Sequence, residues 1–380
     1  MEFIDLKRQQ ERLKETLFAN IQEVLHHGRY ILGPEVELLE QKLKDYVGVS
    51  HGVTCANGTD ALVLALMALD IGPGDEVITT PFTFVATVEA IALRGATPVF
   101  VDIDVDTFNI SPRALEKTLA QLQANNKKVK AILPVHTFGQ MSDMEAISSL
   151  AQTYNIPIIE DAACAFGSRW NGRPSGFFSD LACYSFHPRK SLTTGEGGML
   201  TTKDEALANK LRSLRNHGLD PLSSTPHFKM AGLNYRMTEF QAAIGRVQLK
   251  KMESILENKN LLAKKYDHIF EKTSFITPKT LPLAKHSYQS YVVMLPADYL
   301  SAGAEKQREF IARVRSAGVE VTIGTYCMPL TDFFKQKYKY AETDIPNAWD
   351  VYRRSISVPL YPGLTEDEQL QVVKTMEESL

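Results

Sequence analysis

Apolar residues recur along residues 50–205 in short runs, and longer segments with helical spacing separate most of these runs. The runs are rich in β-branched residues, which is typical of buried strands. They lie at 52–56, 76–79, 98–102, 130–135, 156–160, 181–185 and 199–202, and helical spacing is found at 59–70, 112–122 and 144–154. Strands that alternate with helices predict right-handed crossovers and a mostly parallel sheet covered by helices on both faces.

The segments on either side of this region have different patterns. Residues 1–30 predict an amphipathic helix before the sheet, and residues 236–258 predict a long helix after it. Beyond residue 258 the pattern changes to a smaller α+β unit, with strands expected near 288–295 and 318–323 and a helix at 305–317. A chain of 380 residues favours two domains, which we place at 1–258 and 259–380. We find no repeat or long linker, so we expect the two domains to pack tightly.

The composition excludes several classes of protein. Net charge is −3 without a long run of one sign, which argues against nucleic acid or a membrane surface as the main partner. The charged N-terminus lacks the apolar core of a signal peptide, and no apolar stretch approaches the ~20 residues that span a bilayer. The cysteines are scattered without a CxxC pair, at Cys55, Cys164, Cys183 and Cys327. The sequence thus indicates neither a disulfide framework nor a metal site, and we expect a cytoplasmic protein.

Unusual residues collect where the predicted strands end. Asn57-Gly58-Thr59-Asp60 lies between a strand and a helix. Glycine lets the backbone approach a ligand, and a helix N-terminus offers free amide groups, so this is a phosphate site in principle. The alternative is that Thr59 or Asp60 only caps the helix.

Two more charged residues follow strands. Asp161 ends the run IPIIE, where a carboxylate faces the ligand crevice of a parallel sheet or else caps a helix. Lys190, in SFHPRKSLTTGEGG, precedes a glycine-rich turn and taken alone would be a solvated surface group. The combination of a helix-start phosphate site, a strand-end Asp and a later Lys meets the needs of pyridoxal phosphate. The lysine forms a Schiff base, and the carboxylate keeps the pyridinium nitrogen protonated so that the ring accepts electrons.

Several segments resemble the sugar aminotransferases of the DegT/DnrJ/EryC1/StrS family. They are GRYILGPEVELLE (28–40), CANGTDAL (55–62), GDEVITTPFTFVAT (74–87), EDAACAFGS (160–168), SFHPRKSLTTGEGGM (185–199), GLNYRMTEFQAAIG (232–245) and SVPLYPGLTEDE (357–368). The resemblance runs from about residue 3 to the C-terminus. It implies the type I aspartate-aminotransferase fold, pyridoxal 5'-phosphate as cofactor, and a homodimer with active sites at the subunit interface.

The resemblance also implies roles for individual residues. Lys190 resembles the Schiff-base lysine and Asp161 the partner of the pyridinium nitrogen. Phosphate ligands are implied at Gly58, Thr59 and Ser185, with Asn234 reaching the phosphate from the neighbouring subunit. Phe84 resembles the aromatic residue that stacks on one face of the ring, with Ala163 on the other face. The alternatives are a core position for Phe84 and a helix N-cap for Asn234.

The chain departs from the family pattern at two positions. Cys164 stands where Gln or His usually bonds the phenolic oxygen of the cofactor, and Thr331 stands where a histidine often follows a Pro-Leu pair. These departures affect the tuning of the cofactor and the binding of the sugar or nucleotide. His136 and His187 lie near strand ends, where each either lines the site or is a hydrogen-bonded structural histidine.

The implied reaction moves an amino group in two half-reactions. L-glutamate gives its amino group to the cofactor, and a nucleotide-linked keto-sugar then takes it, with Lys190 as general base and acid. The early motifs favour a 3-keto sugar; a 4-keto nucleotide sugar and a keto-cyclitol are alternatives. Family members that dehydrate sugars have histidine in place of Lys190, and a nicotinamide oxidoreductase would need a GxGxxG motif that is missing here. A non-catalytic binding or regulatory protein would normally have lost Lys190 or Asp161.

Overall fold

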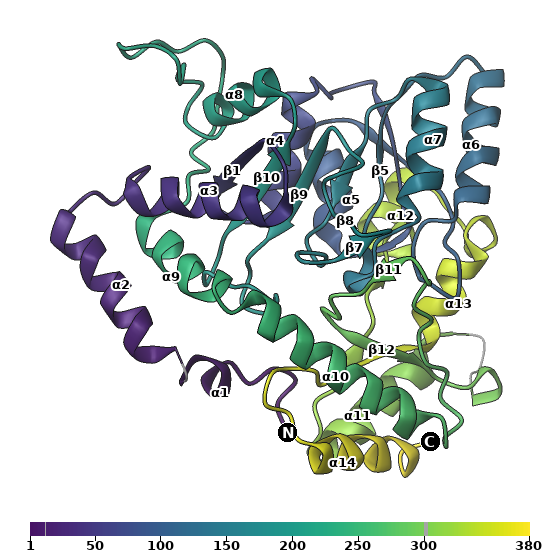
Figure 1. Ribbon diagram of the computed structural model, residues 1–380. Coiled ribbons are helices and arrows are strands. Elements are labelled where there is room, and N and C mark those ends of the chain that lie inside the picture. Colours follow the sequence, from purple (N-terminus) through teal and green to yellow (C-terminus); the bar gives the residue numbers. More distant parts are fainter. Residues whose placement is uncertain (12, 300–302) are drawn as a thin grey trace.

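A central sheet lies at the middle of the protein in the computed structural model, which describes residues 1–11, 13–299 and 303–380 (Figure 1). Its strands follow the order β1 (His51–Cys55), β10 (Gly198–Thr202), β9 (Leu181–Ser185), β6 (Ile159–Asp161), β5 (Val129–Leu133), β2 (Glu76–Thr79) and β4 (Thr97–Phe100). Parallel bridges from Ile132 to Ile158 and from Val135 to Asp161 join β5 to β6. Among these strands β10 runs antiparallel to both neighbours, and the others are parallel to one another. The prediction of a mostly parallel sheet is confirmed.

Helices cover both faces of this sheet, as the sequence predicts. Alternate residues of β9 point to opposite cores: Leu181 and Cys183 to one, Ala182 and Tyr184 to the other. The first face packs against α4 (Gly58–Ala68), α5 (Val85–Leu93) and α8 (Glu205–Leu214). The second packs against α3 (Pro34–Val47), α9 (Glu239–Leu249), α6 (Pro112–Ala124) and α7 (Met144–Tyr154). Burial on both faces explains why the strands read as continuous apolar runs.

Two predicted helices are divided in the structure. Residues 1–30 contain α1 (Leu6–Glu11) and α2 (Lys14–His27), and residues 236–258 contain α9 and the start of α10 (Met252–Phe270). α9 begins after Thr238, whose side chain forms a capping box with Gln241. The chain turns at Lys250 and Lys251, where no proline or glycine marks a break, so helical periodicity continues through it.

The C-terminal part forms a second core. Its sheet has the order β12 (Tyr291–Met294), β15 (Ser355–Val358) and β13 (Thr322–Ile323). Its other elements are α11 (Glu305–Ser316), α12 (Asp332–Tyr338), α13 (Pro346–Arg354), α14 (Glu366–Glu377) and the short helices η2 (Ala297–Tyr299), η3 (Met328–Leu330) and η4 (Glu342–Asp344). The expected elements at 288–295, 305–317 and 318–323 are thus present. Because α10 runs through residue 258, the domain boundary stays a proposal.

Several contacts tie the two parts together. β14 (Tyr326–Cys327) pairs with β3 (Phe82–Thr83), and β11 (Ala284–Lys285) pairs with β7 (Arg169–Trp170), which also pairs with β8 (Arg173–Pro174). The short helix η1 (Thr137–Gly139) contributes Phe138 to a core shared with Met294. The Met1 amine donates a hydrogen bond to the Gly318 carbonyl, so the N-terminus packs on the C-terminal part. The tight packing expected from the lack of a linker is present.

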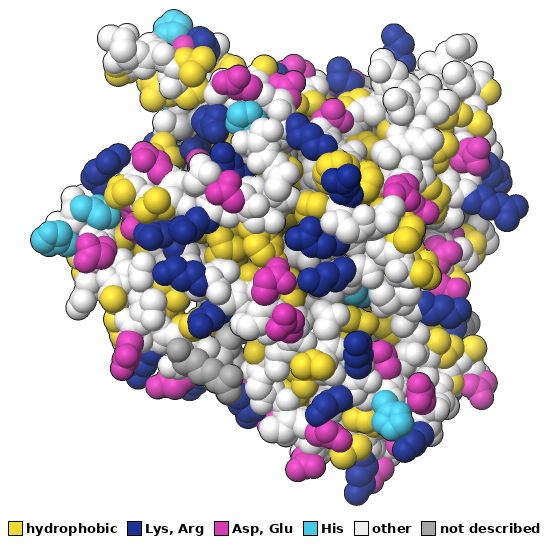
Figure 2. Space-filling view, viewed as in Figure 1, with side chains coloured by type: hydrophobic (Ala, Val, Ile, Leu, Met, Phe, Trp, Pro, Cys, Tyr) yellow, Lys and Arg dark blue, Asp and Glu magenta, His cyan; other side chains and the backbone are white. Residues whose placement is uncertain are grey.

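Basic and acidic side chains are interspersed on the face of the protein shown in Figure 2, so this face is not a simple surface of one charge. In the described part of the chain, no helix combines the length and hydrophobicity needed to cross a bilayer.

Candidate active site

The predicted site residues meet at the edge of the sheet where its parallel strands end. Gly58 follows β1, Asp161 ends β6, and Ser185 ends β9. A Cβ atom added at Gly58 would lie 2.7 Å from the Cβ of Ser185, so the two residues touch. The amine of Lys190 donates a 3.0 Å hydrogen bond to the thiol of Cys164, three residues beyond Asp161. Motifs more than a hundred residues apart in the sequence thus form one cluster.

The start of α4 carries groups that can bind an anion. The helix is capped by Asn57, whose Oδ1 accepts a 2.8 Å hydrogen bond from the Asp60 amide. The alternative roles of Thr59 and Asp60 as caps are therefore wrong, and Thr59 lies in the first turn. The first amide groups of a helix have no acceptor within it. The amides of this first turn, the Thr59 hydroxyl and Ser185, which touches Gly58, could hold a phosphate, and we call this group the Gly58–Ser185 cradle.

Asp161 is buried and is held by two donors. Its Oδ2 accepts a 2.7 Å hydrogen bond from the Thr87 hydroxyl, and its Oδ1 accepts a 3.2 Å hydrogen bond from the Ala163 amide. Burial raises the pKa of the Asp161 carboxyl, while both hydrogen bonds and the charge of Lys190 act in the opposite direction. Residues 162–168 form turns, so the alternative role of Asp161 as a helix cap is wrong.

Phe84 lies three residues before Thr87, the hydrogen-bond donor to Asp161. It precedes α5, and 60% of its surface is exposed, so the alternative of a core position is wrong. Its ring lies 6.4 Å from that of Tyr326, between centroids. Tyr326 arrives from the C-terminal part because β14 pairs with β3. Ala163 is partly buried beside Cys164 and Asp161.

Asn234 lies apart from these contacts. It is exposed, and it forms a backbone bridge with Asn216 in the segment that joins α8 to α9. Its alternative role as a helix cap is wrong because Thr238 caps α9. The side chain is thus available to a neighbouring molecule.

The remaining candidates have local partners. His136 is fully buried; its Nε2 donates a 2.8 Å hydrogen bond to Glu160, and its Nδ1 accepts one from the Ser142 amide. Of its two alternatives, His136 is the structural histidine. His187 is partly exposed, and burial lowers its pKa. The Thr331 hydroxyl donates a 2.8 Å hydrogen bond to the Met328 carbonyl.

Three residues that contact this cluster were not predicted from the sequence: Thr87, Tyr326 and Lys259. Thr87 belongs to the segment PFTFVAT, but nothing in the sequence marks it out from its neighbours. Its hydrogen bond to Asp161 is visible only in the structure. The sequence does mark Lys259 as unusual, because this lysine stands on the apolar stripe of α10 between Ile255 and Leu262. A charged residue on such a stripe is rarely buried without a partner.

The donor set fits pyridoxal phosphate. The Gly58–Ser185 cradle suits its phosphate, the buried Asp161 suits its ring nitrogen, and the Lys190 amine suits its aldehyde. A mostly parallel sheet covered by helices on both faces, with this donor set at the edge where its parallel strands end, is the arrangement of a fold type I pyridoxal-phosphate enzyme, and comparison with known proteins supports this class.

Residues 11–377 match the model of the DegT/DnrJ/EryC1/StrS aminotransferase family. The UDP-2-acetamido-2-deoxy-3-oxo-D-glucuronate aminotransferase of Pseudomonas aeruginosa is 40% identical, with 96% of each chain covered. A pleiotropic regulatory protein of Geobacillus stearothermophilus is 38% identical, with 99% of this chain and 97% of that protein covered. The crystal structure of a DegT DnrJ EryC1 StrS aminotransferase from Brucella abortus is 33% identical and superposes with a TM-score of 0.91 over 100% of this chain and 99% of that chain.

The chain therefore belongs to the DegT/DnrJ/EryC1/StrS aminotransferase family. It is an aminotransferase, and its cofactor is pyridoxal phosphate.

Proposed function

We propose that this aminotransferase moves the amino group of L-glutamate to the 3-keto group of a nucleotide-linked sugar. The observation that carries the proposal is the Lys190 amine, 3.0 Å from Cys164 and next to the buried Asp161, in a chain that is 40% identical to an aminotransferase of a UDP-linked 3-oxo sugar. L-glutamate is the donor that the family resemblance implies.

The bound cofactor would supply the electron sink on which the amino group is exchanged. Lys190 would hold it through its amine and, once displaced by the donor, would accept a proton from one carbon and return it to another. Asp161 would face the ring nitrogen, and its hydrogen bond from Thr87 favours the ionised carboxylate that this contact needs.

The other residues would position the cofactor. Gly58, Thr59 and Ser185 would hold the phosphate at the start of α4, where the helix dipole favours an anion. Phe84 would stack on one face of the ring, and Ala163 would lie on the other.

A homodimer with shared sites is part of the proposal. Asn234 would reach the phosphate of the partner subunit from the segment between α8 and α9. Exposed apolar side chains on this segment, Leu222 at 73% and Phe228 at 65%, support its contact with another chain. In Figure 1 the segment extends away from the central sheet.

A regulatory role without catalysis has less support. One relative is named a regulatory protein, but Lys190 and Asp161 are both present here, Lys190 hydrogen-bonded to Cys164 and Asp161 to Thr87. The four free thiols suit a reducing compartment, which supports the cytoplasm as the proposed location.

Running the reaction backwards tests the substrate. The purified enzyme in its pyridoxal form would be mixed with a panel of 3-amino and 4-amino sugars linked to UDP, TDP or GDP. We expect 3-amino sugars to convert the visible absorption to that of the pyridoxamine form. A response only to 4-amino sugars would select the 4-keto alternative. No response to any of them would direct attention to amino-cyclitols and away from nucleotide sugars.

A further inference from the structure

A second lysine approaches the Lys190 loop from the C-terminal side. Lys259 belongs to α10, and only 4% of its surface is exposed. Its amine donates a 3.0 Å hydrogen bond to the hydroxyl of Ser191, the residue after Lys190. Burying an ammonium group is costly unless it is hydrogen-bonded, so a lysine in this position calls for an explanation.

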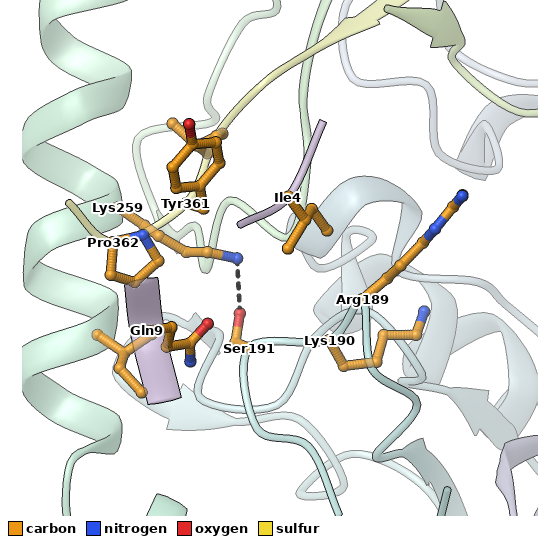
Figure 3. A pocket seen from close by; sticks show the side chains of 10 residues that line it. Ile4, Gln9, Arg189, Lys190, Ser191, Lys259, Tyr361 and Pro362 are labelled. Carbon is orange, nitrogen blue, oxygen red and sulfur yellow. Dashed lines mark hydrogen bonds between the residues drawn. The ribbon is translucent and has the colours of Figure 1, made fainter. Parts of the chain in front are cut away.

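The Lys259 side chain lies behind the loop and not inside the cofactor site. Figure 3 shows its amine directed at Ser191, while the side chain of Lys190 extends away from it. The pocket that the two lysines help to line has a cavity volume of about 10 Å³. That is close to the space of one water molecule, so this pocket does not hold a substrate. Lys259 therefore does not contact a substrate from this pocket, and its hydrogen bond is to the loop that holds Lys190.

A glutamine secures the same loop from a second direction. Gln289 Oε1 accepts a 3.0 Å hydrogen bond from the Ser191 amide, and Gln289 Nε2 donates to the Arg189 carbonyl. Both neighbours of Lys190 are thus held by Gln289, and one of them also by Lys259. Ser287, two residues before Gln289, donates a 3.0 Å hydrogen bond to the Cys164 carbonyl. The C-terminal part therefore braces both ends of the Lys190–Cys164 contact.

We propose that Lys259 is a positioning residue for Lys190, anchoring its loop through Ser191 so that the amine is held ready for the cofactor aldehyde. This inference rests on the proposed role of Lys190. Burial lowers the pKa of Lys259 to about 8, so at neutral pH its ammonium remains a charged donor to Ser191, and charged donors form the stronger hydrogen bonds.

The test compares two forms of the cofactor on cofactor-free enzyme. Pyridoxal phosphate must meet the Lys190 amine, whereas pyridoxamine phosphate uses the same phosphate and ring contacts without a bond to lysine. In Lys259→Met we expect the rate of pyridoxal phosphate attachment to fall roughly tenfold or more, because small misplacements of a reacting group have large effects. The dissociation constant of pyridoxamine phosphate should stay within about twofold.

Three further variants make the result specific. Lys259→Arg retains a charged donor and should recover most of the attachment rate. Ser191→Ala removes the hydroxyl that accepts the hydrogen bond of Lys259, and it should slow attachment of pyridoxal phosphate to the same extent. This variant also tests the proposal if Lys259→Met does not fold. The exposed Lys264 lies on the same helix, so Lys264→Met is the matched control and should behave as wild type.

The outcomes separate this inference from the proposed function. The positioning role would be overturned if Lys259→Met weakened pyridoxamine phosphate binding as much as it slowed pyridoxal phosphate attachment. It would also be overturned if neither Lys259→Met nor Ser191→Ala slowed attachment. Either result would leave Lys190 as the attachment point. Covalent attachment that persists in Lys190→Ala would instead overturn the proposed function.

Discussion

The Thr87 hydroxyl donates a 2.7 Å hydrogen bond to Asp161, and both residues are buried. This contact stabilises the carboxylate against the effect of its burial. Thr87→Val should therefore lower kcat roughly 10- to 100-fold, the range expected for a lost hydrogen bond to a charged group. Thr87→Ser keeps the hydroxyl and should retain most of the activity. Steady-state kinetics of wild type, Thr87→Val and Thr87→Ser would measure these kcat values. Equal kcat values would show that the function of Asp161 does not depend on the Thr87 hydroxyl.

Lys190→Ala should abolish steady turnover, lowering the rate by more than about 10³-fold, because one amine both holds the cofactor and moves the proton. The fold and the binding of pyridoxamine phosphate should survive. Borohydride reduction of the wild-type enzyme, followed by peptide mapping, should find the cofactor on Lys190. Recovery of the label on another lysine would contradict the assignment.

Cys164 is expected to lie near the phenolic oxygen of the cofactor. Its thiol accepts a 3.0 Å hydrogen bond from Lys190, the residue proposed to hold the cofactor. A thiol is a weaker hydrogen-bond partner than an amide. Cys164→Gln should shift the pH at which the visible absorption of the bound cofactor changes, without loss of activity. A spectral titration that matches wild type would place Cys164 outside contact with the cofactor.

The exposure of Asn234 predicts complementation between subunits. Asn234→Ala and Lys190→Ala should each be nearly inactive alone. After subunit exchange, mixed dimers should contain one site with both native residues and regain activity. Exchange would be demonstrated with tagged chains, and inactivity despite exchange would disprove the contribution in trans.

Lys259 predicts a dependence of stability on pH. Burial lowers its pKa from the usual 10.5 to about 8, so between these values the unfolded chain holds a proton that the folded protein lacks. The contribution of Lys259 to the free energy of unfolding therefore rises with pH across that window and is smallest below pH 8. Relative to Lys259→Met, the wild-type free energy of unfolding should increase by about 3 kcal/mol from pH 8 to 10.5.

Chemical denaturation at several pH values would measure this difference. Lys264→Met serves as the control and should follow wild type across the window. A difference between wild type and Lys259→Met that does not change with pH would show that Lys259 keeps its proton throughout.

Local patterns predicted much of the fold and the centre of the site. The strands at 76–79 and 181–185 were placed correctly because burial on both faces produces continuous apolar runs. Gly58, Asp161 and Lys190 could be grouped because parallel strands end at one edge of a sheet. Tyr326 could not be placed in this way. It reaches Phe84 through the pairing of β14 with β3, segments more than two hundred residues apart, and no local spacing encodes that pairing.

That same pairing has a mechanical consequence. Tyr326 is the strand partner of Thr83, the Thr83 hydroxyl lies 2.8 Å from that of Thr87, and Thr87 bonds Asp161. A short relay of contacts thus runs from the C-terminal part to the carboxylate at the base of the site. A displacement of β14 would pull on β3 and then on the hydroxyl that steadies Asp161. The pairing of β14 with β3 thus connects the position of the C-terminal part to the carboxylate proposed to face the cofactor ring, through contacts that do not include the substrate.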